Sequence, residues 1–468
     1  MARIAPLSPL RYALAPLGGD LGRVVAPPYD VISPDERRRL LDHDPHNVVR
    51  LILPEGEGDA KYAHAASLLS AWRADGALVR DEEPGFYRLE QTFAAPGAAP
   101  GAPRVTRRGF LALVELRPFS DRVVLPHERT LSGPKEDRYK LFRATQTNLS
   151  PGFMLYRDPA RSLDAAVAEG DVLARFTSAD GVEHTVAKVR RPASVRAIVD
   201  GIARSTLLIA DGHHRYETAL RYGAHVTETQ PDAHPSGEHR FFMTFLVNGD
   251  DPGLVVFPTH RHVHSLASFS FDDMLARVAA TFTQAALPAG ADAGVLLAAL
   301  AGARGRGPSL VAAAPDGRAT LLVLRADVDL AAHSTLGPQP AVLRRTDVAV
   351  LHAGLLEGVL GITPEAQAAK TNLWYPQDAA AALATLRAGR AGADAVGGVG
   401  GVGGGGSGGT AAGGDVLFLM NATPVEQVRA VAEAGEVMPQ KSTFFHPKVP
   451  TGLAIHTLDP TRVVPGER

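Results

Sequence analysis

The sequence contains no cysteine. This absence excludes disulfide bonds, thiolate catalysis, and zinc or iron–sulfur sites that are ligated by cysteine. The chain also has almost no net charge, because 48 basic residues face 50 acidic ones and leave a formal charge of −2. A balanced chain has no overall electrostatic attraction to nucleic acid or to an anionic membrane, so neither is an expected partner.

Long apolar runs are missing as well. No stretch of 18 apolar residues is present, so the sequence has no segment typical of a membrane span. Near its start, Pro6, Pro9, Arg11 and Pro16 interrupt the apolar residues, which is not the pattern of a signal peptide. We therefore expect a cytoplasmic protein. We also find no internal repeat.

The composition is otherwise that of a globular protein, with 45% apolar and 21% charged residues. A chain of 468 residues exceeds what one hydrophobic core usually serves, so more than one packed unit is expected. The predicted fold class is α+β, with a mixed-sheet catalytic unit at residues 1–265 and an α/β unit at residues 266–468. Residues 397–414 are almost all glycine, which predicts a surface insertion in the second unit.

Hydrophobic periodicity and turn residues predict the local elements. The expected helices span residues 34–41, 60–74, 216–223, 271–287, 294–303, 348–360 and 378–388. The expected strands span residues 86–93, 108–115, 204–210, 241–248, 253–264, 309–314, 320–326 and 416–420. Ser33 or Asp35 would cap the first of these helices.

The most distinctive motif is Asp-Gly-His-His-Arg at residues 211–215, where a buried strand turns directly into a helix. The amides and the dipole at a helix N-terminus favour an anion. Gly212 permits close approach of the backbone, and the planar fork of Arg215 suits phosphate oxygens. His213 and His214 add donors that could follow charge on a transferred phosphoryl group. The structural alternative is a tight turn in which Arg215 pairs with a nearby carboxylate.

A second motif, at residues 126–138, combines an acid, several bases and a Ser-Gly-Pro turn. Such a loop could close over a polyphosphate whose charge Arg129, Lys135 and Arg138 neutralise. Glu128 could then accept a hydroxyl proton or hold magnesium. The alternative is a solvated charged loop that begins a helix at residue 135 or 136.

Two single residues extend the candidate site. Asp30 follows a rigid Pro-Pro pair and could place a carboxylate over a ligand, or it could lie at a simple junction between strand and helix. Lys441 could reach a phosphate from a loop, or it could lie in a surface turn before a strand at Phe444. A different chemistry is suggested by His260, His262 and His264, which alternate and would share one face of a strand. That face predicts either a metal site or a partly exposed strand.

Residues 211–215 resemble the phosphate-binding motif of the ParB/sulfiredoxin superfamily, in which a glycine, two variable residues and an arginine open a helix. Sulfiredoxins have a nucleophilic cysteine at the position of His213, so sulfinic-acid reduction is excluded here. ParB proteins have a Gly-Glu-Arg-Arg-like motif and a helix-turn-helix DNA reader, and the sequence has neither.

Nearly the whole chain resembles one family of unknown function, DUF 1015. The segments that carry the resemblance are residues 26–33, 126–138, 144–151, 211–215, 250–253 and 438–445. Residues 397–414 are not part of the family pattern, which supports their assignment as an insertion. The family is similar to free-serine kinases of the ParB/sulfiredoxin fold. The resemblance therefore implies phosphoryl transfer from ATP, with Mg²⁺, to a small hydroxylated metabolite, the best candidate being free L-serine.

The candidate site residues follow from the motifs and this resemblance together. The catalytic candidates are Glu128, Asp30, Asp211 and His213. The candidates for binding the nucleotide are Gly212, His213, His214, Arg215, Arg129, Lys135, Arg138 and Lys441. Two alternative functions stay open: a ParB-like switch that binds ATP or CTP and has no small-molecule acceptor, and a metal-dependent hydrolase that uses the histidines.

Overall fold

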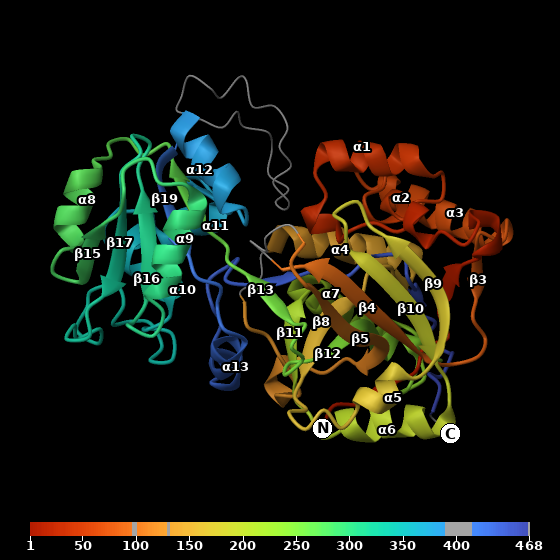
Figure 1. Cartoon of the computed structure of the whole chain (residues 1–468). Helices are drawn as coiled ribbons and strands as arrows, with labels where there is room; N and C mark the ends of the chain where they lie inside the picture. Colours follow the sequence, from red (N-terminus) through yellow and green to blue (C-terminus); the bar gives the residue numbers. More distant parts are fainter. Residues whose placement is uncertain (96–100, 129–131, 389–413, 467–468) are drawn as a thin grey trace. The chain divides into compact units, whose positions relative to one another are not determined.

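The computed structural model describes residues 1–95, 101–128, 132–388 and 414–466 (Figure 1). The chain forms two compact units. The first comprises Met1–Pro126, Thr130–Val255 and Phe445–Arg468, and the second comprises His127–Arg129 and Val256–Phe444. This division differs from the expected boundary at residue 265, because the chain returns to the first unit after residue 444. A sequence pattern that is local cannot reveal such a return.

The first unit is built on a nine-stranded sheet with the order β6-β11-β8-β12-β5-β4-β10-β9, to which β1 adds by pairing with β5. The strands are β1 (Ile4–Ala5), β4 (Phe86–Ala94), β5 (Arg104–Glu115), β6 (Val124–Leu125), β8 (Gly152–Tyr156), β9 (Asp171–Thr177), β10 (Glu183–Val189), β11 (Leu207–Asp211) and β12 (Phe241–Asn248). The pairs β11–β6 and β12–β8 are parallel and the other pairs are antiparallel, so the sheet is mixed.

Helices pack on one face of this sheet: α4 (Ser132–Thr145), α5 (Asp164–Ala168), α6 (Pro192–Ile202) and α7 (His213–Thr229). The helices α1 (Pro34–His43), α2 (Val49–Ile52) and α3 (Ala60–Ala74) pack on one another, and α3 packs on α4. Phe110, Ala112 and Val114 alternate along β5 and therefore point to the same side. They share a core with Ile198 of α6 and Tyr216 of α7. The helix that carries the phosphate motif is thus anchored in the main core of the unit.

Short elements complete the first unit. The 3₁₀ helices are η1 (Ala15–Leu17), η2 (Leu21–Arg23), η3 (Tyr29–Val31), η4 (Phe119–Asp121) and η5 (Glu238–Arg240). Two small sheets pair β2 (Leu10–Tyr12) with β3 (Leu78–Arg80), and β7 (Thr147–Asn148) with β21 (His456–Thr457). The second of these pairs fixes the last part of the chain to the segment that precedes β8.

The second unit contains a six-stranded sheet in the order β15-β17-β16-β19-β14-β18, and all of its pairs are antiparallel. Its strands are β14 (Arg261–His264), β15 (Phe282–Ala286), β16 (Ser309–Ala313), β17 (Ala319–Leu324), β18 (Leu373–Trp374) and β19 (Gly414–Met420). The chain passes from one unit to the other within β13 (Val255–Phe257) and again within β20 (Phe444–His446). The helices are α8 (Phe271–Val278), α9 (Ala293–Gly302), α10 (Asp347–Ala349), a π-helix η6 (Val350–Glu357), α11 (Pro364–Ala369), α12 (Ala379–Ala388) and α13 (Val425–Glu433).

Both faces of this second sheet are covered. Leu310 and Ala312 of β16 belong to one core, together with residues of α8 and η6. Val311 and Ala313 face the opposite side and belong to another core, with residues of α9 and α12. The alternation of side chains along one strand therefore explains why the unit has three layers.

Several local predictions are confirmed. Ser33 caps α1 by accepting a hydrogen bond from the amide of Glu36 at 3.1 Å. The predicted bounds of α3 and β12 agree with the structure. The mixed α/β class with a large mixed sheet is also as predicted. The predicted glycine-rich insertion falls outside the described residues, except for Gly414 at the start of β19.

The helix predicted at residues 271–287 is wrong in its second half. α8 ends at Val278, and Phe282–Ala286 form the edge strand β15. Phe282 is buried in the same core as Phe271, Met274 and Val278 and continues their helical spacing, so the sequence pattern alone favours a longer helix. In the structure the backbone from Phe282 onwards is satisfied instead by pairing with β17. The helix predicted at residues 348–360 is not a regular α-helix, because α10 continues from Val350 as the π-helix η6 and ends at Glu357.

Candidate functional site

The turn between β11 and α7 contains the predicted phosphate motif. β11 lies between β6 and β8 and ends at Asp211. Gly212 has φ +91°, a left-handed conformation that residues with a Cβ rarely adopt. A Cβ at this position would lie 3.0 Å from the guanidinium carbon of Arg215. Glycine is therefore needed here both for the backbone conformation and for the closeness of the arginine.

The guanidinium of Arg215 lies inside this turn and is 5% exposed. Its Nη2 donates to Asp211 Oδ2 at 3.0 Å, and its Nη1 donates to the backbone carbonyl of Pro151. These bonds clamp the end of β11 to the segment that precedes β8. The structure thus contains the carboxylate pair that the sequence left open as the alternative. These bonds use two of the five N–H groups of the guanidinium and turn them towards acceptors within the protein.

The start of α7 keeps the features expected of an anion site. The first amides of an α-helix have no helical carbonyl partner, and the helix dipole makes this end positive. His213 is 8% exposed, whereas Gly212 and His214 are half-buried. The backbone at Gly212 and His214 therefore lies closer to the surface than the guanidinium of Arg215 does.

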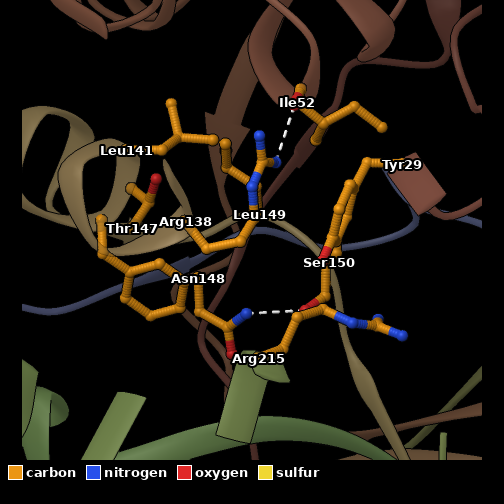
Figure 2. Close-up of a pocket in the computed structure, with 10 residues that line it drawn as sticks. Tyr29, Ile52, Arg138, Leu141, Thr147, Asn148, Leu149, Ser150 and Arg215 are labelled. Carbon is orange, nitrogen blue, oxygen red and sulfur yellow. Dashed lines mark hydrogen bonds between the residues drawn. The ribbon is translucent and has the colours of Figure 1, made fainter. Parts of the chain in front are cut away.

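Tyr29 and Arg138 lie beside Arg215, around a small cavity of about 20 Å³ (Figure 2). The guanidinium of Arg138 lies 4.2 Å above the ring of Tyr29 and donates to the carbonyl of Ile52 at 2.7 Å. Burial raises the pKa of Tyr29 to about 12, and the charge of Asp30 adds to this effect. Tyr29 is therefore a neutral hydroxyl at physiological pH. The cavity has room for about one water molecule, so a nucleotide would have to bind outside it.

Segment 144–151, which the sequence singled out, forms one wall of this cavity. Asn148 donates to the carbonyl of Ser150 at 2.7 Å and accepts from the amide of Met243 at 2.8 Å. These bonds fix the chain before β8, where the carbonyl of Pro151 meets Arg215. Two motifs that are far apart in sequence thus hold each other in place.

Asp30 lies on η3, directly after Tyr29, and is half-buried. Its Oδ1 is buried, and no hydrogen-bond donor reaches it from the part of the chain that the structure describes. A carboxylate oxygen in this position suits a ligand hydroxyl or a hard cation, because such an oxygen is costly to bury without a partner. This is the observation that best fits the predicted catalytic role of Asp30.

The other predicted cations of the first unit are paired with acids. Lys135 of α4 forms an ion pair with Glu217 of α7 and remains partly exposed. Arg138 is 6% exposed and also donates to Asp137, at 3.0 Å from its Nε. Arg129, which the sequence predicted to contact phosphate, lies outside the described residues. Lys135 and Arg138 therefore stabilise the helices around the motif, whatever else they contact.

Sequence reasoning missed Lys448. Its Nζ lies 3.7 Å from Asp211 Oδ2, on the same oxygen that accepts from Arg215. The side chain of Lys448 is 18% exposed. The available signal was the run Pro-Lys-Val-Pro-Thr-Gly at residues 447–452, where a lysine stands between two prolines in a rigid turn. No local pattern could show that this turn meets Asp211.

Glu128 and Lys441 belong to the second unit, where they gather around Arg261. Arg261 is 1% exposed and donates from Nε to His352 Nε2 at 3.0 Å and from Nη2 to the carbonyl of Lys441 at 3.1 Å. Burial lowers the pKa of Arg261 to about 10, and the charges of Tyr375 and Glu128 oppose this effect. The predicted residues therefore fall into two groups, one in each unit.

The alternating histidines do not form a metal centre in the structure. His260 and His262 are 0% and 2% exposed, and burial lowers the pKa of each to about 4. His260 Nδ1 accepts from the amide of Met420 at 3.1 Å, and the ring of His262 meets the ring of Trp374 edge-on. Within the described ranges, no group of three or more His, Asp or Glu side chains is arranged to hold a metal ion. The histidines here have packing roles.

None of the helices in the part of the chain that the structure describes is both long and apolar enough to cross a membrane. No curated protein matches the chain. Several solved structures are similar to it at low identity, three of which illustrate the range. A free serine kinase in complex with AMP is 12% identical with a TM-score of 0.35, and the alignment covers 75% of this chain and 93% of that one. A conserved hypothetical protein from Pyrococcus furiosus is 12% identical with a TM-score of 0.34, covering 75% and 97%.

The third similar structure, SbnI from Staphylococcus aureus with a C-terminal truncation, is 9% identical with a TM-score of 0.34, and the alignment covers 76% of this chain and 90% of that one. Such scores do not assign an activity to the chain. The family comparison is more direct, because one family matches residues 4–349, which is most of the sequence. The chain therefore belongs to the family described as Protein of unknown function (DUF1015).

Proposed function

We propose that the chain is a nucleotide-dependent phosphotransferase whose phosphate site is the turn between β11 and α7. The observation that supports this most is the convergence of the motifs at one place in the first unit. The left-handed Gly212, the start of α7 and the cations Arg215 and Lys448 meet at this turn. Asp30, whose Oδ1 has no hydrogen-bond donor among the described residues, follows Tyr29, which lines the cavity beside Arg215. The same motif supports a ParB/sulfiredoxin-like core for the first unit.

In this proposal the backbone of Gly212, His213 and His214 binds phosphate oxygens, since amides at a helix N-terminus suit an anion. His213 donates a further hydrogen bond as charge develops during transfer. Arg215 keeps the turn in shape through Asp211 and Pro151. Magnesium, when bound, neutralises charge on the polyphosphate, and an oxygen without a donor, such as Asp30 Oδ1, fits it chemically.

The acceptor in this proposal is a small hydroxylated metabolite. The acceptor oxygen attacks the terminal phosphorus of ATP, the bond from that phosphorus to the bridging oxygen breaks, and ADP leaves. The hydroxyl proton passes to a carboxylate, for which Asp30 is best placed in the first unit because Asp211 already pairs with Arg215 and Lys448. Glu128, Arg129 and Lys441 stay candidates from the sequence alone. Free L-serine is the proposed acceptor because of the family resemblance of the motifs.

The test is to incubate the full chain with Mg²⁺, a panel of amino acids, and ATP, ADP or CTP in turn. Mass spectrometry should then detect O-phosphoserine together with the matching nucleotide product. Nucleotide hydrolysis that is independent of every amino acid would instead support the ParB-like switch. Absence of any nucleotide binding by the wild-type protein would reject both proposals.

A further inference from the structure

The segment that carries Lys448 is held from two sides. On one side, Arg107 of β5 donates to the carbonyl of Pro447, and Gln91 of β4 donates to the carbonyl of Lys448 at 3.0 Å. On the other side, Thr451 and Ala26 exchange two backbone hydrogen bonds, of 2.8 and 3.1 Å. The position of Lys448 is therefore set by the sheet below it and by the chain that leads to Tyr29.

Arg107 is a fully buried cation, so the contacts of its guanidinium indicate what it does in the fold. Its side chain is 0% exposed, and its guanidinium lies 4.7 Å from the ring centre of Phe153 and 5.5 Å from that of Phe245. Its Nε and Nη1 find no hydrogen-bond acceptor among the residues that the structure describes. Burial lowers the pKa of Arg107 to about 9, so it stays charged at neutral pH. A buried cation with unused donors is costly. Besides the carbonyl of Pro447, its Nη2 donates to Oε1 of Gln91, whose amide in turn holds the carbonyl of Lys448, so Arg107 and Gln91 fix residues 447 and 448 together.

Asp211 Oδ2 is shared unequally between two cations. Arg215 Nη2 is at hydrogen-bond distance, 3.0 Å, whereas Lys448 Nζ is at 3.7 Å, beyond a good hydrogen bond. The arginine side chain is 6% exposed and the lysine side chain 18%. Arg215 is thus the inner cation that shapes the turn, and Lys448 is the outer cation that an arriving anion meets first.

We propose that the ammonium group of Lys448 binds the phosphate groups of the ligand at the β11–α7 turn, and that Arg107 is a positioning residue that sets its place through the carbonyl of Pro447. The inference deepens the proposed function and rests on it for the identity of the ligand, a nucleoside polyphosphate. The ligand class follows from the chemistry of the site, since an ammonium beside helix-end amides suits phosphate oxygens.

The test is isothermal titration of the full chain with three probes: ATP with Mg²⁺, inorganic pyrophosphate, and adenosine. Lys448→Met should weaken binding of ATP and pyrophosphate by about 10- to 100-fold, the usual worth of a charge-assisted hydrogen bond, and leave adenosine affinity unchanged. Lys448→Arg should retain most of the affinity. The matched control is Lys140→Met, which removes an exposed lysine of α4 that pairs with Asp59 and should change nothing.

Arg107→Lys keeps the positive charge but removes the planar guanidinium that donates to the carbonyl of Pro447. The variant should therefore bind pyrophosphate more weakly, while adenosine still binds. The outcomes separate the two proposals. If Lys448→Met binds ATP as the wild type does, the assignment of Lys448 is overturned and the phosphotransferase proposal stands. If pyrophosphate binding depends on Lys448 but no acceptor is phosphorylated, the assignment stands and the phosphotransferase proposal fails. A wild-type chain that binds neither ATP nor pyrophosphate overturns both.

Discussion

Asp211 accepts a hydrogen bond from Arg215 across the left-handed Gly212, at 3.0 Å between Oδ2 and Nη2. The pair closes the turn on itself, and the second arm of the guanidinium fastens it to the carbonyl of Pro151. The arginine that the sequence assigned to phosphate is thus part of the framework of the site. This relationship makes the role of Arg215 separable by experiment from that of Lys448.

Arg215→Ala should destabilise the protein and abolish nucleotide binding together. Removing the guanidinium leaves the carboxylate of Asp211 and the carbonyl of Pro151 without their donor, a loss of about 3 kcal/mol for a largely buried pair. Urea unfolding and ATP titration of the same variant measure both effects. Arg221→Ala is the control, because Arg221 lies on the same helix in an exposed pair with Glu136, and should cost less than about 1 kcal/mol. Unchanged ATP binding in Arg215→Ala would contradict both nucleotide proposals.

Gly212→Ala should perturb the turn in two ways. A left-handed conformation costs an alanine about 1–2 kcal/mol, and the new Cβ would press on the guanidinium of Arg215. Gly76→Ala separates the two contributions, since Gly76 has φ +82° and open space at its Cβ position. The thermal midpoint should therefore fall further for Gly212→Ala than for Gly76→Ala. Equal shifts would mean that the crowding of Arg215 has no energetic effect.

Asp30→Asn should separate catalysis from binding. The amide cannot accept the hydroxyl proton as the carboxylate does, so we expect the rate of product formation to fall at least about 100-fold. Binding of ATP without Mg²⁺ should change little, because the proposed phosphate contacts lie at Gly212 and Lys448. Asp35→Asn, at an exposed position on α1, is the control and should keep full activity. A fully active Asp30→Asn would remove Asp30 from the mechanism and direct attention to Glu128.

The second unit should lose stability in mild acid. Burial holds the pKa of His260 and His262 at about 4 in the folded chain, whereas an unfolded histidine has a pKa of about 6.5. Their stabilising effect is complete above pH 6.5. It declines as the pH falls towards 4, because the unfolded chain then takes up protons that the folded chain does not.

This pH dependence can be measured through Trp374, whose ring meets His262. The chain has two tryptophans, so Trp72→Phe leaves Trp374 as the fluorescent reporter. The urea midpoint should decrease between pH 7 and pH 4.5, and His262→Gln should make that decrease shallower. A midpoint that is constant over this range would show that these histidines titrate normally.

The features of the fold and of the site that depend on residues close together in the sequence could be predicted. The Gly212 turn, the cap at Ser33 and the length of α3 follow from residue types within a few positions of one another. The proximity of Asp30, Arg138 and residues 211–215 was suggested only by family resemblance. It arises because η3, α4 and α7 are brought together by the packing of the first unit.

The rest depended on contacts between distant parts of the chain. The approach of Lys448 to Asp211 requires residues after the second unit to return to the first, which no periodicity encodes. The pairing of Arg215 with Asp211 was left open because both a phosphate and a carboxylate satisfy a guanidinium equally well. The error at residues 271–287 has a similar origin, since the partner strand β17 lies later in the chain.

The late position of Phe445–Arg468 has a consequence for how the protein is made. A ribosome releases this segment only after the second unit has emerged. Until then the nascent first unit lacks the turn at residues 447–452, which contains Lys448, and also lacks β21, the strand that pairs with β7. The turn at residues 211–215 is then already synthesised but not yet able to meet its outer cation. Assembly of the candidate site is thereby deferred until the second unit has been synthesised, and a chain that stops before Phe445 carries the motif without its completed surroundings.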